Sequence, residues 1–581
     1  MSLPETPAPS GLPRHRHLPG LLVVVILVAT VIRIAFFAEL MHRFPFYGST
    51  CEGYDQHLYD TWAMAIVGGD WLSRSQGPFY GSPLYAYVLA ANYAITGPGN
   101  VAAGIAMNGL FGVCAAALAA VLGARFFGLI GGLTAGLLMA LNGAQLSTEA
   151  MLLSDSLVPA FCLAALWLIA RQQSHERASK EVRPWPWVLP GLLLGAAVLA
   201  KGFVVLGAAG LCATVAAPAL RRQWKCLAAG AAMAAGICIV QAAPILRNGL
   251  MYGQWTVALN GPVTLYVGNA PGSTGIFLKP AGFSEKAGRL DASGQPASAW
   301  LRELGREVRA HPGAVGLVLL RKAALFFNSW DAPDNGNYYF VRRYAFTLKA
   351  LTFGPLPLYV VGFLGLVLTV RRWRILVPFY VFAALFALGV ILTVVNGRYK
   401  LPFLAWLTVL GGGAAATLTQ HLRAHRYWVG AVTGLGAVVL ASAFWPRGPI
   451  GLQARWSPLR PLEFINNAAV LSSQGRGEEA MVLLEDGADL FPWDPRFAER
   501  LAYLYLAAGR PQDAAVVTER ALARNVVTQR ILERRVLAYR ALSLSEEARQ
   551  AALDLAQRYP DSKLAGETIP DGSVPSVVPP G

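Results

Sequence analysis

The sequence predicts an all-α polytopic membrane protein with a helical repeat domain at its C-terminal end. Hydrophobic residues make up 55% of the 581 residues and charged residues only 14%, which is too apolar for a soluble chain of this length. Apolar runs of near-bilayer length recur between residues 18 and 445, with Lys and Arg gathered in the segments between them. After Trp445 the composition becomes polar, and Ala and Gly recur at a 34-residue interval.

The apolar runs predict about 11 to 13 membrane spans, because roughly 20 apolar residues cross a bilayer as a helix. The first run follows Arg14 and Arg16 and has no small-residue cleavage site, so we interpret it as a retained anchor preceded by a cytoplasmic tail, 1–17. Eleven runs can be placed: 18–39, 102–122, 126–144, 155–171, 186–201, 203–219, 226–244, 349–370, 375–395, 401–419 and 427–445.

Basic clusters fall in every second connection between these runs, which assigns those connections to the cytoplasmic side. The alternate segments, chiefly 41–101 and 245–348, are then expected on the outer face. The net charge of +16 follows from this pattern, so no nucleic-acid partner is predicted. The six cysteines form no CxxC pair, and this argues against a disulfide framework or a zinc site.

Two short helices are predicted in the first outer segment. The run 83–95 would rise only about 20 Å, too little to cross a bilayer, so we interpret it as an interfacial helix. A second helix of about 13 residues precedes Gly68 and places Asp55, Tyr59 and Trp62 on one stripe. Asp55 is either the N-cap of this helix or a carboxylate that faces a cavity, and both interpretations remain open.

Other acidic and basic residues lie in or beside the predicted spans, where removing a charged group from water costs free energy. Glu149 and Asp155 occur in the outer stretch "STEAMLLSDS", where Asp155 has helix capping as its alternative use. The cations of this kind are Arg33, Lys201, Arg398 and Lys400. Ionisable groups in or beside spans are candidates for function, although Arg33 and Lys400 could instead extend to the lipid headgroups.

The second outer segment begins with Arg247 at the membrane edge. Gly, Asn and Pro punctuate short β-prone runs over 247–277, and this pattern predicts turns and small strands. No Walker loop, HExxH, GxSxG or dinucleotide fingerprint is present, so no cofactor is predicted. His57 near Asp55 is only a weak metal signal, and the question of a divalent metal stays open.

The C-terminal region resembles the tetratricopeptide repeat. Gly475 and Gly509, and likewise Ala480, Ala514 and Ala548, are 34 residues apart. Three repeats are expected over 461–561, after a linker, 447–460, and before a disordered tail, 562–581. The charge pattern places the repeats outside the cytoplasm, where their groove could bind a protein partner or acceptor.

Local patterns follow one another along residues 18–446: "YDQHLYDTWAMAIVGGDW", "SPLYAYVLAANYAITG", "ARFFG", "STEAMLLSDS", "LAKGF", "RNGLMYGQW" and "NGRYKLPF". In this order they resemble the bacterial glycosyltransferase family 39. This family belongs to the GT-C glycosyltransferases, together with protein O-mannosyltransferases and the lipid A aminoarabinose transferase. The resemblance implies a GT-C membrane domain, 18–446, that transfers a sugar from a polyprenyl-phosphate carrier at the outer face of the bacterial inner membrane.

The resemblance also implies roles for individual residues. Asp55 matches the catalytic outer-loop aspartate, although Gln56 replaces the second acid of the common Asp–Glu pair. Glu149 and Asp155 match the second acidic loop. Donor phosphate would be bound by Arg33, Lys201, Arg247, Arg398 and Lys400, and the substrate pocket would be lined by Tyr59, Trp62 and Tyr85. The chemistry agrees, since a carboxylate can act as general base while cations stabilise a leaving phosphate.

Two other functions remain open at this point. A lipid-linked oligosaccharide ligase or polymerase would also use many spans and outer arginines. A non-catalytic scaffold or transporter that displays a repeat domain is the third, although the spans show no internal duplication of the kind that many transporters have. The sequence specifies neither the sugar nor the acceptor.

Overall fold

The computed structural model describes residues 17–43, 54–218, 224–280, 282–292, 296–447 and 458–565. These residues are helical and contain no strand; one isolated bridge joins Asn142 to Phe353. They form two compact units: the first extends to Pro458, and the second begins at Leu459 and also includes His42 and Arg43 at the end of the first helix. Three predicted segments lie wholly or mostly outside the described residues: the N-terminal tail, the linker and the C-terminal tail.

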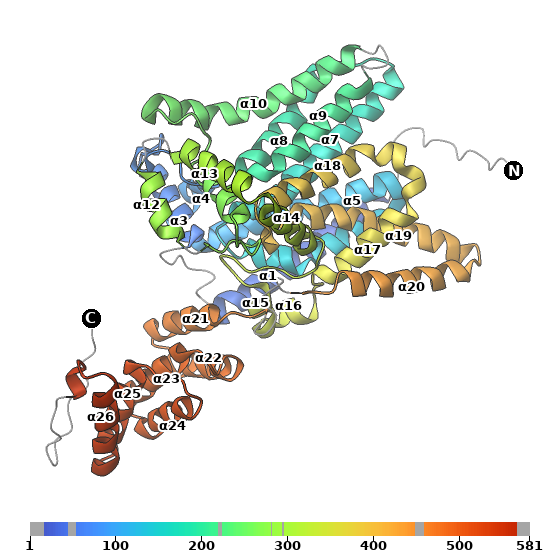
Figure 1. The fold of residues 1–581 in the computed structure, drawn as a ribbon. Helices are drawn as coiled ribbons and strands as arrows, with labels where there is room; N and C mark the ends of the chain where they lie inside the picture. Colours follow the sequence, from blue (N-terminus) through green and yellow to red (C-terminus); the bar gives the residue numbers. More distant parts are fainter. Residues whose placement is uncertain are drawn as a thin grey trace. The chain divides into compact units, whose positions relative to one another are not determined.

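Apolar helices dominate the first unit (Figure 1), and each of the eleven predicted runs falls on one of them. Six stretches of the described chain, comprising α1, α5, α7, α10, α18 and α19, are long and apolar enough to cross a membrane, and α8, α9, α17 and α20 are apolar but shorter. The chain is a multi-pass membrane protein. The bounds are α1 (Leu18–Arg43), α5 (Val101–Ala140), α7 (Val158–Ser179), α8 (Val188–Ala200), α9 (Val205–Ala216), α10 (Trp224–Tyr252), α17 (Pro355–Leu368), α18 (Trp373–Leu392), α19 (Leu401–Arg423) and α20 (Tyr427–Ala443).

Helix α5 is a hairpin of two arms, because the backbone breaks at Gly128 with a φ of 83°. Small residues meet across the turn: Gly123 faces Gly131, and Gly132 faces Ala124. These pairs are nearly symmetric about Gly128, so the arms run antiparallel. Side chains this small allow the two backbones to approach closely. The predicted runs 102–122 and 126–144 correspond to the two arms.

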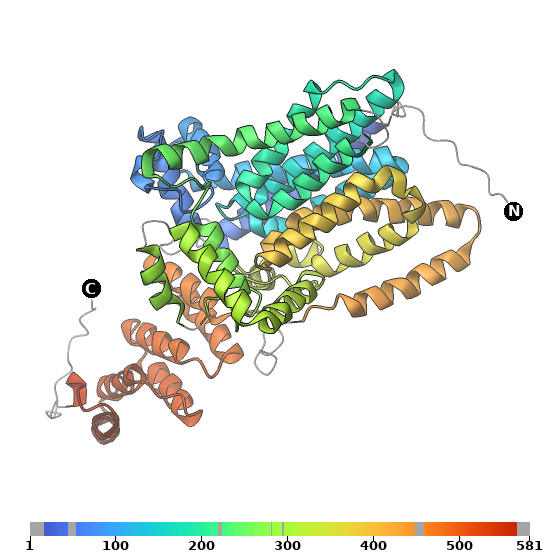
Figure 2. The same cartoon turned by 45° about the horizontal axis from the view of Figure 1, so that its top comes forward.

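Helix α19 lies at the centre of the first unit and packs against α5 and α17. Its first fourteen residues, 401–414, are all buried. Other apolar helices pack in neighbouring pairs, with α7 on α8, α8 on α10, and α9 on α18, and Figure 2 shows the helices of this unit from a second direction. Because the start of α19 is packed on all sides, the residues that immediately precede it are held in a fixed position.

The two short helices predicted in the first outer segment are present as α3 (Asp55–Val67) and α4 (Leu84–Thr96). They pack against each other. Tyr59 of α3 meets Tyr85 of α4 edge to face at 5.2 Å between ring centroids, and Trp62 lies 5.1 Å from Phe79. This aromatic layer supports the start of α3, where Asp55 lies.

Turns are present at 253–259 and 270–277, but the prediction of small strands in the segment 247–277 is wrong. Helix α10 continues to Tyr252, and a further helix, α11 (Asn260–Asn269), follows it. Tyr266 of α11 packs on Trp300 of α13 (Pro296–Ala310) at 5.0 Å. Tertiary packing of this kind overrides local β-propensity. The other short helices of the unit are α6 (Gly143–Glu149), α12 (Phe283–Asp291), α14 (Pro312–Phe326), α15 (Tyr338–Tyr344) and α16 (Phe346–Ala350).

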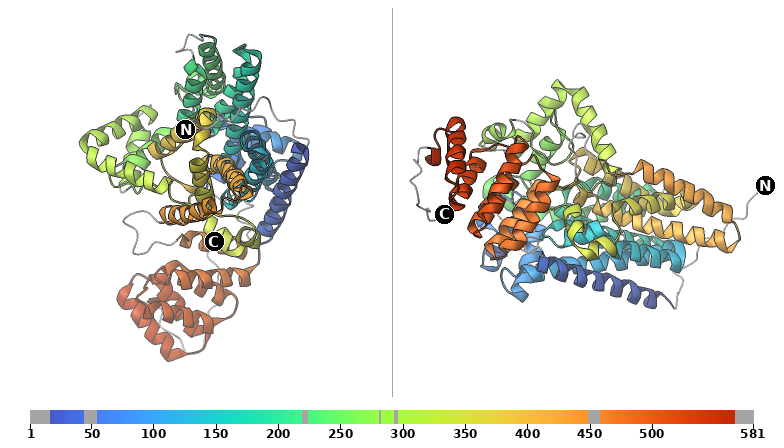
Figure 3. Two further views of the ribbon diagram at one scale, coloured as in Figure 1. Left: turned by 90° about the vertical axis from the view of Figure 1, so that its right-hand side faces the viewer. Right: turned by 90° about the horizontal axis from the view of Figure 1, so that it is seen from below.

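The second unit contains six helices that stack as three successive hairpins (Figure 3). Gly475 and Gly509, which end the first helix of the first two hairpins, have φ values of 77° and 70°, a conformation that glycine adopts without strain. Ala480, Ala514 and Ala548 are fully buried where the helices pack most closely. The helices are α21 (Pro461–Ser473), α22 (Gly477–Leu490), α23 (Pro495–Ala507), α24 (Pro511–Ala523), α25 (Gln529–Ala541) and α26 (Ser545–Arg558).

Candidate functional site

Arg398 is the centre of a cluster of charged side chains just before α19. It belongs to the short turn η7 (Gly397–Lys400), and its side chain is only 8% exposed. Its Nη2 lies 3.0 Å from Oδ2 of Asp55 and 2.6 Å from Oδ2 of Asp334, and its Nη1 lies 3.1 Å from Oδ2 of Asp155. Nζ of Lys201 lies 2.9 Å from Oδ2 of Asp155. We call these five residues the Arg398 cluster.

The members of the cluster come from separate parts of the first unit. Asp55 is the first residue of α3, and Asp155 belongs to the turn η2 (Ser154–Ser156) before α7. Lys201 joins α8 to the turn η4 (Gly202–Val204), and Asp334 lies in the loop between α14 and α15. The structure therefore brings together four residues that the sequence predicted separately, and adds Asp334.

Asp55 is the carboxylate of the cluster that faces solvent. Its side chain is 47% exposed, whereas that of Asp155 is 1% exposed. It does not cap its helix: Tyr54 occupies the cap position, and no side-chain capping hydrogen bond is formed there. Instead, Nδ2 of Asn335 donates to Oδ2 of Asp55 at 2.7 Å, and the Asp55 backbone N–H donates to Oδ1 of Asn335 at 3.2 Å. The capping interpretation of Asp55 is wrong.

The surroundings of Asp55 favour its ionised form. Partial burial opposes the charge, but the positive charges of Arg398 and Lys201, together with hydrogen bonds from Arg398 and Asn335, outweigh that cost and hold the pKa of Asp55 below its usual value. The carboxylate is therefore ionised at neutral pH and available to accept a proton.

The carboxylate of Asp155 also binds charged side chains instead of capping a helix. Helix α7 begins after Leu157 without a side-chain cap, and the carboxylate of Asp155 lies between Lys201 and Arg398. The capping interpretation of Asp155 is therefore wrong as well. Two cations around one buried carboxylate offset much of the desolvation cost that each of the three groups incurs.

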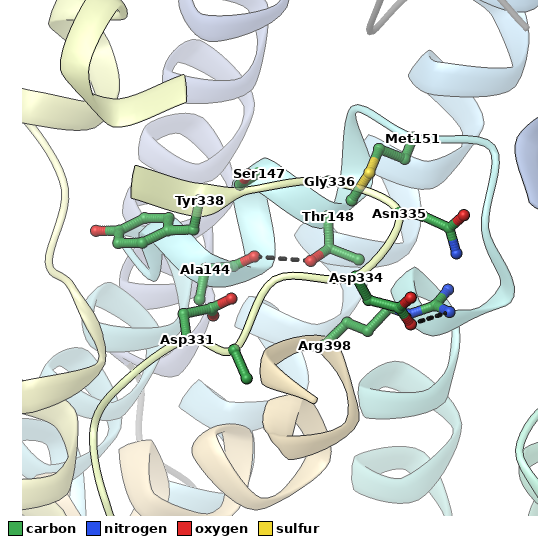
Figure 4. A pocket seen from close by; sticks show the side chains of 11 residues that line it. Ala144, Ser147, Thr148, Met151, Asp331, Asp334, Asn335, Gly336, Tyr338 and Arg398 are labelled. Carbon is green, nitrogen blue, oxygen red and sulfur yellow. Dashed lines mark hydrogen bonds and ion pairs between the residues drawn. The ribbon is translucent and has the colours of Figure 1, made fainter. Parts of the chain in front are cut away.

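A pocket adjoins the cluster (Figure 4). Arg398 and Asp334 form one part of its wall. The α6 segment supplies Ser147, Thr148 and Met151, and the loop before α15 supplies Asp331, Asn335 and Gly336. Charged and polar groups thus line a space that opens beside the buried guanidinium.

Arg33 and Glu149 form a separate ion pair. Both side chains are buried, with 2.8 Å from Nη2 to Oε1 and 2.8 Å from Nε to Oε2. A Cβ atom on Gly112 would overlap both groups, so this glycine leaves the space that the pair occupies. Two residues predicted to act in the site are thus bound to each other within the helices.

Lys400 and Arg247 also have structural partners. Nζ of Lys400 donates to the backbone carbonyls of Leu325, Asn328 and Trp330 at 2.7 to 3.0 Å. The guanidinium of Arg247 donates to three carbonyls of the segment 72–77 at 2.6 to 3.0 Å. Both cations hold backbone segments in place, and neither belongs to the Arg398 cluster.

Tyr59 and Trp62 of α3 and Tyr85 of α4 do not line the pocket. All three are buried, and the walls of the pocket come from α6 and the residues after it, the loop before α15 and Arg398. These aromatic residues pack α3 against α4, and their predicted role as lining of the substrate pocket has no counterpart in this pocket.

The sequence analysis missed the loop 331–337, "DAPDNGN". Asp334 accepts from Nδ2 of Asn396 at 2.7 Å as well as from Arg398, and Asn335 holds Asp55. The Asp, Asn, Pro and Gly content of this loop is typical of a turn, so the sequence alone did not indicate that the loop belongs to the site. A signal was available, since two acids and two amides follow an apolar helix on the predicted outer side.

No group of three or more His, Cys, Asp or Glu side chains within the described ranges is arranged to hold a metal ion. In the Arg398 cluster, the three carboxylates converge on a guanidinium.

Residues 471–532 match the family described as "Tetratricopeptide repeat". The C-terminal helices are tetratricopeptide repeats. No curated protein matches the sequence.

Solved structures that resemble the chain include an archaeal oligosaccharyltransferase and ArnT. The archaeal oligosaccharyltransferase AglB from Archaeoglobus fulgidus aligns with 75% of this chain at 15% identity and a TM-score of 0.38, and this chain spans 57% of its length. ArnT from Cupriavidus metallidurans in the apo state aligns with 67% of this chain and 78% of its own at 18% identity and a TM-score of 0.32. Likeness at this level identifies neither a family nor an activity for this chain.

Proposed function

We propose that the chain is an integral-membrane glycosyltransferase that moves a sugar from a polyprenyl-phosphate donor to an acceptor at the non-cytoplasmic face. The observation that carries this proposal is the placement of Asp55. It is an ionised, half-exposed carboxylate in contact with the buried Arg398, beside a polar pocket at one end of the membrane helices. Such a carboxylate can act as a general base, and the cationic side chains beside it can stabilise the charge of a leaving phosphate.

Asp55 takes the proton of the acceptor hydroxyl as that oxygen attacks the anomeric carbon of the sugar. The bond from this carbon to the phosphate oxygen breaks, and the lipid phosphate leaves with the bonding electrons and additional negative charge. Arg398 and Lys201 stabilise this charge, because charge-assisted hydrogen bonds to phosphate oxygens are strong in a desolvated site.

The cluster has three carboxylates for two cations, so a phosphate must displace a carboxylate from Arg398. Asp55 is the one displaced, because it is the most exposed of the three and comes from a short surface helix. Losing the guanidinium removes the charge that lowers its pKa, and the pKa of Asp55 then rises. Donor binding thereby makes Asp55 a stronger base when a base is required.

A lipid-linked donor explains the absence of a nucleotide-binding loop from the sequence, since the activated sugar arrives through the membrane. Undecaprenyl phosphate, named with one ArnT structure, and dolichol-phosphate, named with AglB, are carriers of the proposed class. We place the GT-C domain at 18–446 within family 39, and the protein in the bacterial inner membrane. The site and the repeats, 461–561, then face the periplasm.

The function is tested in cells by lipid extraction. Cells that carry Asp55→Asn in place of the wild-type protein should accumulate a polyprenyl-phosphate sugar and lack that sugar on the acceptor. Asp70→Asn is the matched control, since Asp70 is an outer-segment carboxylate that accepts hydrogen bonds from Arg74 and Ser75 of its own turn. Normal levels of both donor and product with a correctly inserted Asp55→Asn protein would rule out the proposed role of Asp55.

Orientation is tested by C-terminal fusions. Alkaline phosphatase, which is active only outside the cytoplasm, should be active when fused after the repeats, and a cytoplasmic fluorescent reporter should be silent. The reverse result would place the repeats in the cytoplasm and overturn the assignment of the faces.

A further inference from the structure

Helix α14 is held by the rest of the first unit along one of its faces. Val318 and Leu325 are buried on this face, and the helix packs against α11, α13 and α18. Lys322 of the same face is fully buried, and its Nζ donates to Oδ1 of Asn269 at 2.6 Å and to the carbonyl of Thr393 at 2.9 Å. These bonds join α14 to the ends of α11 and α18, so the opposite face of α14 has a fixed direction.

The opposite face of α14 is apolar and exposed. Leu317 is 48% exposed and Leu320 is 70% exposed. The exposed residues follow one another at spacings of three, four and three, which places them on a single line along the helix. We call this line the α14 stripe: Leu317, Leu320, Ala324 and Phe327. A continuous apolar surface of this kind marks a contact with a membrane or another molecule.

The α14 stripe adjoins a surface that faces lipid. Helix α18 is long and apolar enough to cross the membrane, and it exposes Ala384, Leu388 and Leu392. It ends at Leu392, one residue before the carbonyl that binds Lys322 of α14. The apolar surface of a membrane helix therefore continues onto α14, and this favours the bilayer as the partner of the stripe.

The length of α14 indicates that it lies along the membrane surface. Its 15 residues rise only about 22 Å, which is less than the ~30 Å of hydrocarbon in a bilayer. In the right-hand view of Figure 3, α13 and α14 form a V that extends away from the long helices. A helix with one apolar face can lie in the interface with that face among the acyl chains.

Unpaired arginines accompany the stripe. Arg321 lies on the same side of α14, four residues after Leu317 and three before Ala324. Arg302 and Arg309 are exposed on the neighbouring α13. None of these three side chains forms a hydrogen bond or an ion pair within the part of the chain that the structure describes.

The acids of α13 are occupied by other cations. Glu303 and Glu307 bind Lys286 of α12 at 2.8 and 3.0 Å, and Glu303 also binds Arg306 at 2.9 Å. The charge of the other arginines is therefore left for an outside anion. Guanidinium groups bind phosphate oxygens through paired hydrogen bonds, and basic residues at a membrane surface attract anionic lipids.

We propose that α14 lies in the membrane leaflet nearest the Arg398 cluster, with the α14 stripe among the acyl chains, and that Arg302, Arg309 and Arg321 bind the headgroup phosphates of anionic phospholipids. The carbonyl of Leu325 in α14 accepts from Lys400, which follows Arg398 closely in the chain, and this fixes the leaflet. The inference concerns a surface outside the Arg398 cluster and does not depend on the proposed glycosyltransferase function.

The test measures lipid contact at single positions of the full-length protein in vesicles. The fluorescent amino acid acridonylalanine replaces Leu320, Leu435 or Val516, one at a time. Leu435 is a 67% exposed residue of the membrane helix α20, and Val516 is a 51% exposed residue of the repeat helix α24. The vesicles contain phosphatidylcholine and phosphatidylglycerol, and one of the two lipids carries a nitroxide on its acyl chain, which quenches a fluorophore that it contacts.

The labels at positions 320 and 435 should be quenched, and the label at 516 should not. At position 320, nitroxide-labelled phosphatidylglycerol should quench as if bound ~3- to 5-fold more tightly than phosphatidylcholine, because a basic residue at the surface favours an anionic lipid by about this factor. At position 435 the two lipids should quench equally.

The combined variant Arg302→Gln, Arg309→Gln and Arg321→Gln should lower the preference at position 320 to about 1, while quenching by phosphatidylcholine stays unchanged. The matched control removes the same charge from three exposed arginines of the repeat unit, and it should keep the full preference. Its substitutions are Arg500→Gln, Arg520→Gln and Arg524→Gln.

Each part of the inference has its own contrary result. A label at 320 that is quenched no more than one at 516 would overturn the membrane contact. If light scattering then shows a dimer, a second copy of the chain covers the stripe and the inference is equally wrong. Equal quenching by both lipids, or a preference that survives loss of the three arginines, would overturn the headgroup assignment. Sugar transfer is not measured, so the proposed function stands or fails separately.

Discussion

Asn335→Ala should make Asp55 harder to ionise. Asn335 donates to the Asp55 carboxylate at 2.7 Å and accepts from its backbone N–H at 3.2 Å, so it both orients this group and stabilises its charge. The pKa of Asp55 lies below its usual value partly because of this donor. Removing the amide leaves Arg398 and Lys201 in place but weakens the preference for the ionised form.

The size of the effect follows from the exposure of Asp55. A hydrogen bond to a charged group contributes ~1.5–3 kcal/mol when it is well protected. Because Asp55 is 47% exposed, solvent screening reduces this to ~0.7–1.5 kcal/mol. One pKa unit corresponds to about 1.36 kcal/mol, so the acidic limb of the activity profile should move upward by ~0.5–1 pH unit.

The assay is the pH dependence of kcat/KM for sugar transfer, which reports ionisations of the free enzyme. The free energy of unfolding depends on the same ionisation. A carboxylate with a lowered pKa stabilises the fold above its unfolded pKa, and this contribution is lost as pH falls through its folded pKa. In Asn335→Ala this contribution should be smaller, and its loss should be complete at a higher pH. Tyr339→Phe, which removes a different hydrogen bond of the same loop, is the control. An acidic limb that stays at the wild-type position in Asn335→Ala would refute the reasoning.

Three further substitutions test the structural assignments. Gly112→Ala should lower the midpoint of thermal unfolding, because its methyl group would force apart the buried pair of Arg33 and Glu149; an unchanged midpoint would contradict the pairing. Lys400→Met should also lower the midpoint, because three backbone carbonyls lose their donor at a cost of ~1–3 kcal/mol each where they stay unpaired. Arg247→Met should speed proteolysis within residues 72–77, whose carbonyls it holds, and an unchanged cleavage rate would argue against this role.

The helical architecture could be predicted from the sequence because it depends on local pattern. Apolar runs of near-bilayer length, the Gly-ended helix that begins at Asp55 and the 34-residue repeat each produced the expected helices. The segment 247–277 was mispredicted because β-prone residues such as Val263 and Tyr266 lie in α11, where packing against α13 decides the conformation.

The site could be predicted only in part, because the sequence shows which residues are ionisable and not which of them meet. Glu149 and Asp155 lie six residues apart and look equivalent, yet one is bound to Arg33 and the other to Arg398. Lys201 and Arg398 were found because a cation beside a span is costly. Asp334 and Asn335 were missed because turn residues have many uses, and only the tertiary structure shows that their loop reaches Asp55 and Arg398.

The role of Asp55 as the base beside a phosphate-binding Arg398 is tested most directly by transfer from a bound donor. Wild type and Asp55→Asn are loaded in nanodiscs with the undecaprenyl-phosphate sugar that the wild type prefers, and transfer is followed in a single turnover. The account predicts that Asp55→Asn binds the donor at least as tightly as the wild type but transfers the sugar ~10²- to 10⁴-fold more slowly, the usual contribution of a general base. Transfer by Asp55→Asn at the wild-type rate would contradict it.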